Sequence, residues 1–220
     1  MTMPRSDGVT GNLWLAQELW ELGAIQFGDF NVGRTEHSPI YLNPRLLIGN
    51  PGAFQRCARV IKEEAETMLS MLHPPLAPFS LVAGVPFGGL HVATAFSLTA
   101  NIPLIYVHPA RGGRDEVIEG KYLPGQTVLI IDDLITHGTS VIETADQLRN
   151  AGLIVRDAIV LLDRKQGGRE RLHSHGINLI AILEIETLLN YLMSNGEIEE
   201  QWYRRSIEYL RSSRQPGEQA

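Results

Sequence analysis

Residues 128–140 have the sequence VLIIDDLITHGTS and join a strand pattern to a helix pattern. The apolar β-formers at the start predict a strand, which is followed by the acidic pair Asp132 and Asp133. A short turn rich in hydroxyl groups comes next, and apolar residues then recur at helical spacing from Val141 to Leu148. Gly152 is typical of the residue that follows a helix. The stretch therefore predicts a strand, an acidic pair, a short loop and a helix.

The chemistry of this loop favours a sugar phosphate as its ligand. The backbone N–H groups of Thr136–Ser140 would point outward at a helix N-terminus, where the helix dipole also favours an anion. The carboxylates of Asp132 and Asp133 accept hydrogen bonds without donating any, which suits a pair of neighbouring hydroxyl groups. A sugar phosphate carries both kinds of group at once.

Two other interpretations of the same stretch need to be compared. An apolar strand ending in two aspartates also occurs in P-loop NTPases, but the Gly-x-x-x-x-Gly-Lys-Ser/Thr loop of that class is absent from the sequence. A Gly-x-Gly-x-x-Gly dinucleotide fingerprint is absent as well. From spacing alone, an ordinary strand-to-helix turn in which one aspartate caps the helix stays open.

The overall composition is that of a globular protein, with 44% hydrophobic and 20% charged residues. A length of 220 residues predicts one domain, and a net charge of −6 predicts neither a nucleic-acid nor a membrane partner. The single cysteine, Cys57, lies among expected core positions of a helix, which predicts a buried inert thiol. A single cysteine is typical of a protein in a reducing compartment. The sequence has no apolar run of transmembrane length, and the polar segment Met1–Thr10 lacks the pattern of a signal peptide. Together these features predict a soluble cytoplasmic protein.

Strand and helix patterns alternate along most of the chain. Strands are expected at Phe27–Phe30, Ile40–Asn43, Leu81–Val85, Leu104–Val107, Val128–Ile131 and Ala158–Leu162, with a polar connector at Asn31–Ser38. Helices are expected at 13–22, from Asn50-Pro51 to the Pro74-Pro75 pair, at His91–Thr99, from Val141 to Gly152 and at Ile185–Arg211. Continuous apolar strands that alternate with helices predict a doubly wound α/β fold with a parallel sheet covered on both faces.

The acidic strand and its loop resemble the phosphoribosyl diphosphate (PRPP) motif of type I phosphoribosyltransferases. Other stretches are similar to orotate phosphoribosyltransferase, especially the domain found in UMP synthase. They are Gly28-Asp29-Phe30, Ser38-Pro39-Ile40-Tyr41, Gly84-Val85-Pro86-Phe87-Gly88-Gly89-Leu90, Ile118-Glu119-Gly120 and the segment Asp157–Gly168. The resemblance extends from about Leu13 to Leu192.

This resemblance implies the type I phosphoribosyltransferase fold, with a central mostly parallel sheet flanked by helices and a small N-terminal hood. We expect a single domain over 1–220, with the hood at about 11–45, the core at about 50–192 and a C-terminal helix at about 196–211. The implied reaction transfers the phosphoribosyl group of PRPP to orotate, which yields orotidine 5′-monophosphate and diphosphate in pyrimidine synthesis. Mg²⁺ and a homodimer are implied with it.

The resemblance also implies roles for individual residues. Asp132 and Asp133 would hold the ribose hydroxyls, and the loop would hold the 5′-phosphate. The implied PRPP-binding residues are Asp132, Asp133, Leu134, Ile135, Thr136, His137, Gly138, Thr139, Ser140, Phe87 and Gly88. The implied orotate-binding residues are Thr136, Arg164 and Arg34. Mg²⁺ would be held mainly by diphosphate oxygens and water, so that no residue is predicted as a dedicated metal ligand.

The chain departs from the family on the loop that follows Leu104–Val107. The family carries an Arg-Lys pair and a further Lys there, whereas this sequence has His108 and Pro109, and the basic residues Arg111 and Arg114. We therefore predict Arg111 and Arg114, together with Asp132 and Asp133, as the catalytic residues. The family's lysine after Gly28-Asp29-Phe30 is replaced by Gly33, next to Arg34. A non-catalytic PRPP-binding regulator, or a phosphoribosyltransferase for another base, stays an alternative.

Overall fold

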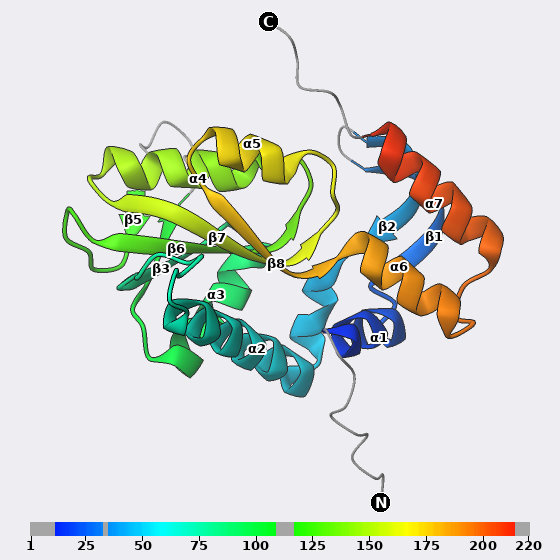
Figure 1. Cartoon of the computed structure of the whole chain (residues 1–220), viewed down its shortest axis with the longest axis horizontal. Helices are drawn as coiled ribbons and strands as arrows, with labels where there is room; N and C mark the ends of the chain where they lie inside the picture. The colour runs from blue at the N-terminus through cyan, green and yellow to red at the C-terminus, as the bar shows by residue number, and fades with distance from the viewer. Residues whose placement is uncertain (1–11, 33–34, 109–116, 214–220) are drawn as a thin grey trace, which may run out of the picture.

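A computed structural model describes residues 12–32, 35–108 and 117–213, and Figure 1 shows its arrangement. A six-stranded sheet carries helices on both faces, and a separate two-stranded sheet lies beside it. Arg34, Arg111 and Arg114, for which the sequence predicts roles in the site, lie outside the described residues. Among the residues that the structure describes, no helix is long and apolar enough to cross a membrane.

The large sheet has the strand order β5-β4-β3-β6-β7-β8. Its strands are β3 (Leu81–Gly84), β4 (Leu104–His108), β5 (Val117–Glu119), β6 (Thr127–Ile135), β7 (Ile154–Asp163) and β8 (Asn178–Glu184). Neighbouring strands are parallel except for the pair β4 and β5, which confirms the predicted mostly parallel sheet. The chain leaves β3 toward β4 on one side and returns at β6 on the other. Ligands of such sheets bind where the strand order reverses, which is here the carboxyl end of β3 and β6.

Helices cover both faces of this sheet (Figure 1). They are α2 (Pro51–Ser70) and α3 (Gly88–Ala100) on one face, and α4 (Thr139–Asn150) and α5 (Gly168–Ser174) on the other. The predicted start of α2 is confirmed, because the side chain of Asn50 accepts a hydrogen bond from the backbone N–H of Ala53 at 3.2 Å. Cys57 of α2 is buried, as predicted, and burial raises the pKa of its thiol to about 12.

The two-stranded sheet is an antiparallel hairpin that packs with helices from both ends of the chain. It consists of β1 (Ile25–Val32) and β2 (Thr35–Leu42), and the helices near it are α1 (Leu13–Glu21), α6 (Ile185–Ser194) and α7 (Glu200–Ser212). Helix α7 packs against β2, and α1 packs against α6 and β8. A short 3₁₀ helix, η1 (Pro44–Gly49), then leads into α2. The predicted boundaries of hood, core and C-terminal helix stay predictions.

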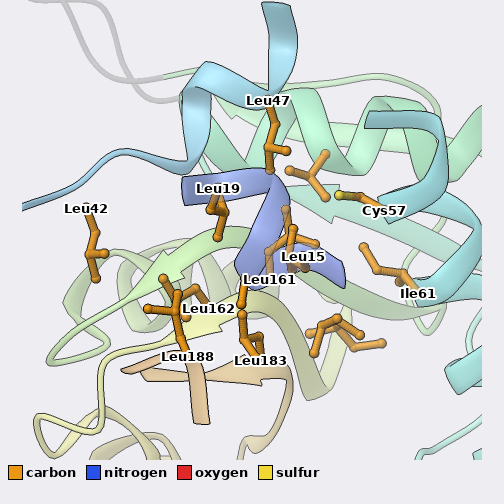
Figure 2. Packing of buried hydrophobic residues seen from close by; sticks show 14 of the residues in the cluster. Leu15, Leu19, Leu42, Leu47, Cys57, Ile61, Leu161, Leu162, Leu183 and Leu188 are labelled. Atoms are coloured by element: carbon orange, nitrogen blue, oxygen red, sulfur yellow. The ribbon is translucent and has the colours of Figure 1, made fainter. Parts of the chain in front are cut away.

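Helix α1 connects the hairpin region to the large sheet through one shared hydrophobic cluster. In Figure 2, Leu15 and Leu19 of α1 lie between Cys57 and Ile61 of α2 on one side and leucines of the sheet and α6 on the other. The labelled leucines on that second side are Leu161, Leu162, Leu183 and Leu188. This cluster is continuous, so the hairpin packs in one hydrophobic core with the strands that carry the site.

Several predicted elements were wrong in extent. The polar connector at Asn31–Ser38 is mostly strand, since β1 and β2 pair as far as Val32 and Thr35. Strand β6 continues to Ile135, so that the acidic pair lies within the strand, because β6 keeps pairing with the longer β7. The helix expected over Ile185–Arg211 is two helices, α6 and α7. Strands β5 and β8 and the helices α5 and η1 were not predicted, and two of the four are shorter than seven residues.

Candidate active site

The loop between β6 and α4 is shaped by Gly138. Its φ of +77° lies in the left-handed region, and an added Cβ would come within 2.3 Å of Leu172 Cδ1. Helix α4 begins at the next residue, with the N–H of Ile142 donating to the carbonyl of Gly138 at 3.0 Å. The first N–H groups of a helix have no partner within it, so the loop Thr136–Ser140 presents backbone donors at the carboxyl edge of the sheet.

Helix α5 and the turn before it pack against this loop. A Cβ added to Gly168, the first residue of α5, would lie 2.5 Å from the carbonyl oxygen of Thr136. The ring Nδ1 of His137 lies 2.8 Å from the carbonyl oxygen of Gln166, which requires a proton on Nδ1. Helix α5 and the turn before it therefore pack directly against the loop and limit the conformations that it can take.

The acidic pair lies where α3 packs tightly against β6. A Cβ on Gly88 would lie 2.3 Å from Asp133 Oδ2, and one on Gly89 would lie 2.5 Å from the carbonyl oxygen of Ile131. Asp132 is buried, and its Oδ1 accepts a hydrogen bond from the N–H of Asp133 at 2.8 Å. Burial, and then the charge of Asp133, raise the pKa of the Asp132 carboxyl well above its ordinary value. The Asp132 carboxyl therefore holds its proton to a higher pH than an ordinary aspartate does.

Arg164 is buried at the end of β7 with few hydrogen-bond partners. Its Nη2 lies 3.4 Å from the hydroxyl of Ser38, and its Nε has no partner among the residues that the structure describes. Burial lowers the pKa of the guanidinium, which nonetheless stays charged. A buried guanidinium with unused donors is suited to a planar anion such as a carboxylate.

The turn after Arg164 is held by buried polar contacts. The carboxylate of Asp163 is fully buried and accepts a hydrogen bond at 2.7 Å from the N–H of Lys165, whose φ is +57°. Arg169 of α5 lies 3.4 Å from the same carboxylate. Nε2 of Gln166 donates to the hydroxyl of Ser213 at 2.9 Å, which links this turn to the residue that follows α7. The orientation of Arg164 is therefore set by distant parts of the chain.

One cavity of about 500 Å³ joins the loop to Arg164. Its polar and charged lining residues are Ser38, Tyr41, Arg45, Asp132, Thr136, His137, Thr139, Ser140 and Arg164. This volume lies within the range of small-molecule sites. A backbone anion site, a carboxyl group and a buried guanidinium thus open on a single cavity large enough for a sugar phosphate and a ring.

The structure brings most of the predicted site residues together at this cavity. Asp132, Leu134, Ile135, Thr136, His137, Gly138, Thr139, Ser140 and Arg164 line it. Three predicted residues, Asp133, Phe87 and Gly88, are not lining residues. Phe87 and Gly88 lie at the start of α3, where Gly88 packs against the side chain of Asp133. Arg34, Arg111 and Arg114 lie outside the described residues, so that their roles stay predictions.

Several residues in or beside this cavity have no role predicted from the sequence. Arg45 of η1 lines it, and its Nε donates to the side chain of Asn43 at 3.1 Å. Gln166 and Arg171 contact the loop from α5 and the turn before it. Gln166 is within a stretch that resembles the family, but Arg45 and Arg171 carry no local motif, because their positions depend on how η1 and α5 pack.

Known proteins resemble this chain over most of its length. The sequence profile of the phosphoribosyl transferase domain matches residues 49–180. An orotate phosphoribosyltransferase of Caenorhabditis elegans is 32% identical over 88% of this chain and 83% of its own length. The crystal structure of orotate phosphoribosyltransferase from Aeropyrum pernix has a TM-score of 0.72 and 30% identity, covering 84% of this chain and 99% of the other.

A longer relative shows the same likeness over part of its length. The UMP synthase structure from Leishmania donovani has a TM-score of 0.78 and 30% identity, covering 91% of this chain but only 42% of the synthase. The chain thus corresponds to less than half of that larger protein. With a domain profile, a sequence relative and a solved structure in agreement, the chain belongs to the orotate phosphoribosyltransferase family of type I phosphoribosyltransferases.

Proposed function

We propose that this protein transfers the phosphoribosyl group of PRPP to orotate, forming orotidine 5′-monophosphate and diphosphate for pyrimidine synthesis. The observation that carries the proposal is Arg164, a buried guanidinium with a partnerless Nε that opens on the same cavity as the loop Thr136–Ser140. Orotate has a carboxylate that a guanidinium can bind through two hydrogen bonds. Family membership supports the same reaction.

The two ends of the cavity give the substrates an orientation. The 5′-phosphate would bind to the backbone donors of Thr136–Ser140, at the N-terminus of α4. The ribose hydroxyls would bind to the carboxyls of Asp132 and Asp133. The orotate carboxylate would then bind to Arg164 at the opposite end, which brings a ring nitrogen of orotate toward C1 of the ribose.

The bond changes define what the residues must stabilise. A bond forms between the orotate nitrogen, which gives up its proton, and C1, while the bond from C1 to the diphosphate oxygen breaks. Positive charge develops on the ribose, and negative charge develops on the leaving diphosphate. The carboxyls of Asp132 and Asp133 would stabilise the first charge, and Arg111 and Arg114 would stabilise the second. Arg45, which lines the cavity, adds a further positive charge.

We propose that Mg²⁺ enters this cavity together with the diphosphate of PRPP. Residues 12–32, 35–108 and 117–213 contain no group of three or more His, Cys, Asp or Glu side chains placed to hold a metal ion. The adjacent carboxyls of Asp132 and Asp133 are hard oxygen donors, and Mg²⁺ commonly combines one or two carboxylates with phosphate oxygens and water. This donor set fits an ion that neutralises part of the diphosphate charge.

We further propose a cytoplasmic homodimer. The support for this is the resemblance to the family together with the single buried cysteine, Cys57, which forms no disulfide within the chain. Sedimentation equilibrium measures the oligomeric state directly, and a monomer at all protein concentrations would contradict the dimer.

The test is an assay of orotate consumption with PRPP and Mg²⁺, run beside a calorimetric titration of PRPP. We expect turnover with orotate, no turnover with uracil or adenine in its place, and formation of diphosphate in equal amount. Tight PRPP binding without turnover of orotate would contradict the proposal and favour the regulator. Turnover of another base would favour a phosphoribosyltransferase of different specificity.

A further inference from the structure

Arg171 of α5 contacts the phosphate loop from outside it. Its Nη1 donates a hydrogen bond of 2.9 Å to the hydroxyl of Thr139. Thr139 is the first residue of α4 and lines the cavity. Arg171 is an exposed residue that follows Thr139 by 32 positions in the sequence. The guanidinium therefore lies at the rim of the loop, next to a hydroxyl that faces the cavity.

The packing of α5 holds Arg171 in this position. Leu172, the next residue, is fully buried and lies directly beneath Gly138, where an added Cβ would come within 2.3 Å of its Cδ1. The start of the same helix is fixed by Gly168, which packs on the carbonyl of Thr136. Because α5 is anchored to the loop at two points, the arginine between them stays near Thr139.

The charge of Arg171 complements what the loop offers an anion. Residues Thr136–Ser140 include no lysine or arginine, and the ring of His137 uses Nδ1 to contact the carbonyl of Gln166. The hydrogen bond to Thr139 uses one of the five N–H donors of the guanidinium. Since the hydroxyl of Thr139 accepts that bond, its own proton is available to a phosphate oxygen in the cavity.

We propose that Arg171 binds the 5′-phosphate of the ribose substrate, as the positively charged partner of the neutral loop. The identity of the ligand as a ribose 5-phosphate rests on the function proposed above. Because its contact is with Thr139 of the phosphate loop, Arg171 contributes to binding of the sugar phosphate and takes no part in recognition of the base.

The experiment compares Arg171→Met with Arg156→Met, which removes the same charge from an exposed position near the start of β7. Arg156 precedes Arg164 by eight residues of strand, which places it roughly 25 Å from the site. Calorimetry measures the affinity of each variant for ribose 5-phosphate and for diphosphate. For Arg171→Met we expect the affinity for ribose 5-phosphate to fall about tenfold or more, as for the loss of one charge-assisted hydrogen bond.

Diphosphate is the internal control, because it binds without a 5′-phosphate, and its affinity should change less than about twofold in either variant. Arg171→Lys, which keeps the charge, should recover part of the loss. Unchanged affinity of Arg171→Met for ribose 5-phosphate would overturn the proposal, as would an equal loss for both ligands, which would indicate a structural effect.

The same measurements separate this proposal from the proposed reaction. Because they need no orotate turnover, a wild-type protein that binds ribose 5-phosphate but consumes no orotate would contradict the reaction and leave the test of Arg171 intact. A wild-type protein that binds no ribose 5-phosphate would overturn both.

Discussion

The two ends of the cavity are built in different ways. The phosphate end comes from one continuous segment, Asp132–Ser140, whose backbone is shaped by glycines and by close packing of α3 and α5. The base end joins Ser38 and Arg164, which are 126 positions apart, and it is held through Gln166 and Ser213, which are 47 positions apart. One end is local in the sequence, and the other is assembled from side chains of three distant regions.

This difference has consequences for sensitivity to substitution. At the phosphate end, the loop binds through backbone N–H groups, which most side-chain changes leave in place, and Arg171 adds one side-chain contact in the proposal above. An atom added at Gly89 would meet the backbone of Ile131 and Asp132. At the base end, one guanidinium carries the recognition, and neighbouring hydrogen bonds orient it. We therefore expect substitutions that add bulk to have the largest effects at the phosphate end. At the base end, we expect substitutions of the guanidinium or its partners to weaken orotate binding to different degrees.

The largest effect is expected for Gly89→Ala. The added Cβ would lie 2.5 Å from the carbonyl oxygen of Ile131 and 2.7 Å from Asp132 Cα, so that backbone must move. We expect the free energy of unfolding to fall by roughly 1–3 kcal/mol. PRPP affinity should fall about a hundredfold or more, since the acidic pair is displaced. Chemical denaturation and calorimetry measure the two effects.

Gly52→Ala is the matched control for this change. Gly52 lies in the first turn of α2, and the atom nearest to a Cβ added there, Asn50 Oδ1, would be 3.6 Å from it. The same methyl group should leave PRPP affinity unchanged and leave stability unchanged or slightly increased. Equal behaviour of Gly52→Ala and Gly89→Ala would show that close packing at Gly89 does not shape the site.

At the base end, Arg164→Lys tests the role of the guanidinium. An ammonium group cannot form the paired hydrogen bonds to a carboxylate, so the orotate KM should rise about tenfold to a hundredfold. The PRPP KM should change far less, because the two ends are separate. Steady-state kinetics with each substrate varied in turn measures both. An equal rise in both constants would instead indicate general destabilisation, and no rise in either would place Arg164 outside the base site.

A pH-dependent effect is expected at Asp132. Its pKa is raised in the folded protein, so its contribution to stability is full below the ordinary aspartate pKa and is lost as the pH rises through the raised value. The side chain of Asp132→Asn cannot ionise, so this variant does not lose stability as the pH rises. Its Tm should exceed that of the wild type by about a few degrees at pH 8. The difference should shrink toward pH 4. PRPP affinity should fall in the same variant, since an amide is a weaker acceptor for ribose hydroxyls.

Thermal unfolding of wild type and Asp132→Asn across this pH range checks the prediction. Asp146→Asn is a suitable control, because Asp146 is an exposed residue of α4 that pairs with Arg149 at 3.6 Å. A Tm difference for Asp132→Asn that does not vary with pH would contradict the raised pKa.

The smallest effect is expected for Ser213→Ala. This change removes the hydrogen bond of 2.9 Å from Gln166 and loosens the turn that carries Arg164. The orotate KM should rise about threefold, as for one neutral hydrogen bond, with little change in the PRPP KM. Ser212→Ala is the control, since the hydroxyl of Ser212 donates within α7, to the carbonyl of Tyr209 at 2.9 Å. Identical kinetics of the two variants would show that Ser213 does not orient the base end.

The sequence by itself determined the parts of this protein that depend on neighbouring residues. The apolar run before Asp132 and the helical spacing after Ser140 were enough to predict the strand, the loop and the helix. The alternation of such units predicted the parallel sheet, because the central strands β3 and β6 are buried on both faces over most of their length and are therefore largely apolar. Even here the end of β6 was misplaced, since pairing with β7 extends the strand through residues that are polar.

The resemblance assigned Arg164 to the base, but only the tertiary structure decided the contacts that hold it and the contacts around the loop. Arg164 follows an apolar strand like many surface arginines, and its burial against Ser38 arises from how the hairpin and α7 pack. Arg45 likewise reaches the cavity through the docking of η1, and Arg171 reaches Thr139 at its edge through the docking of α5. These contacts join residues far apart in the chain, so no local pattern encodes them. They form because burying the apolar faces of the hairpin and helices brings their polar side chains to one cavity.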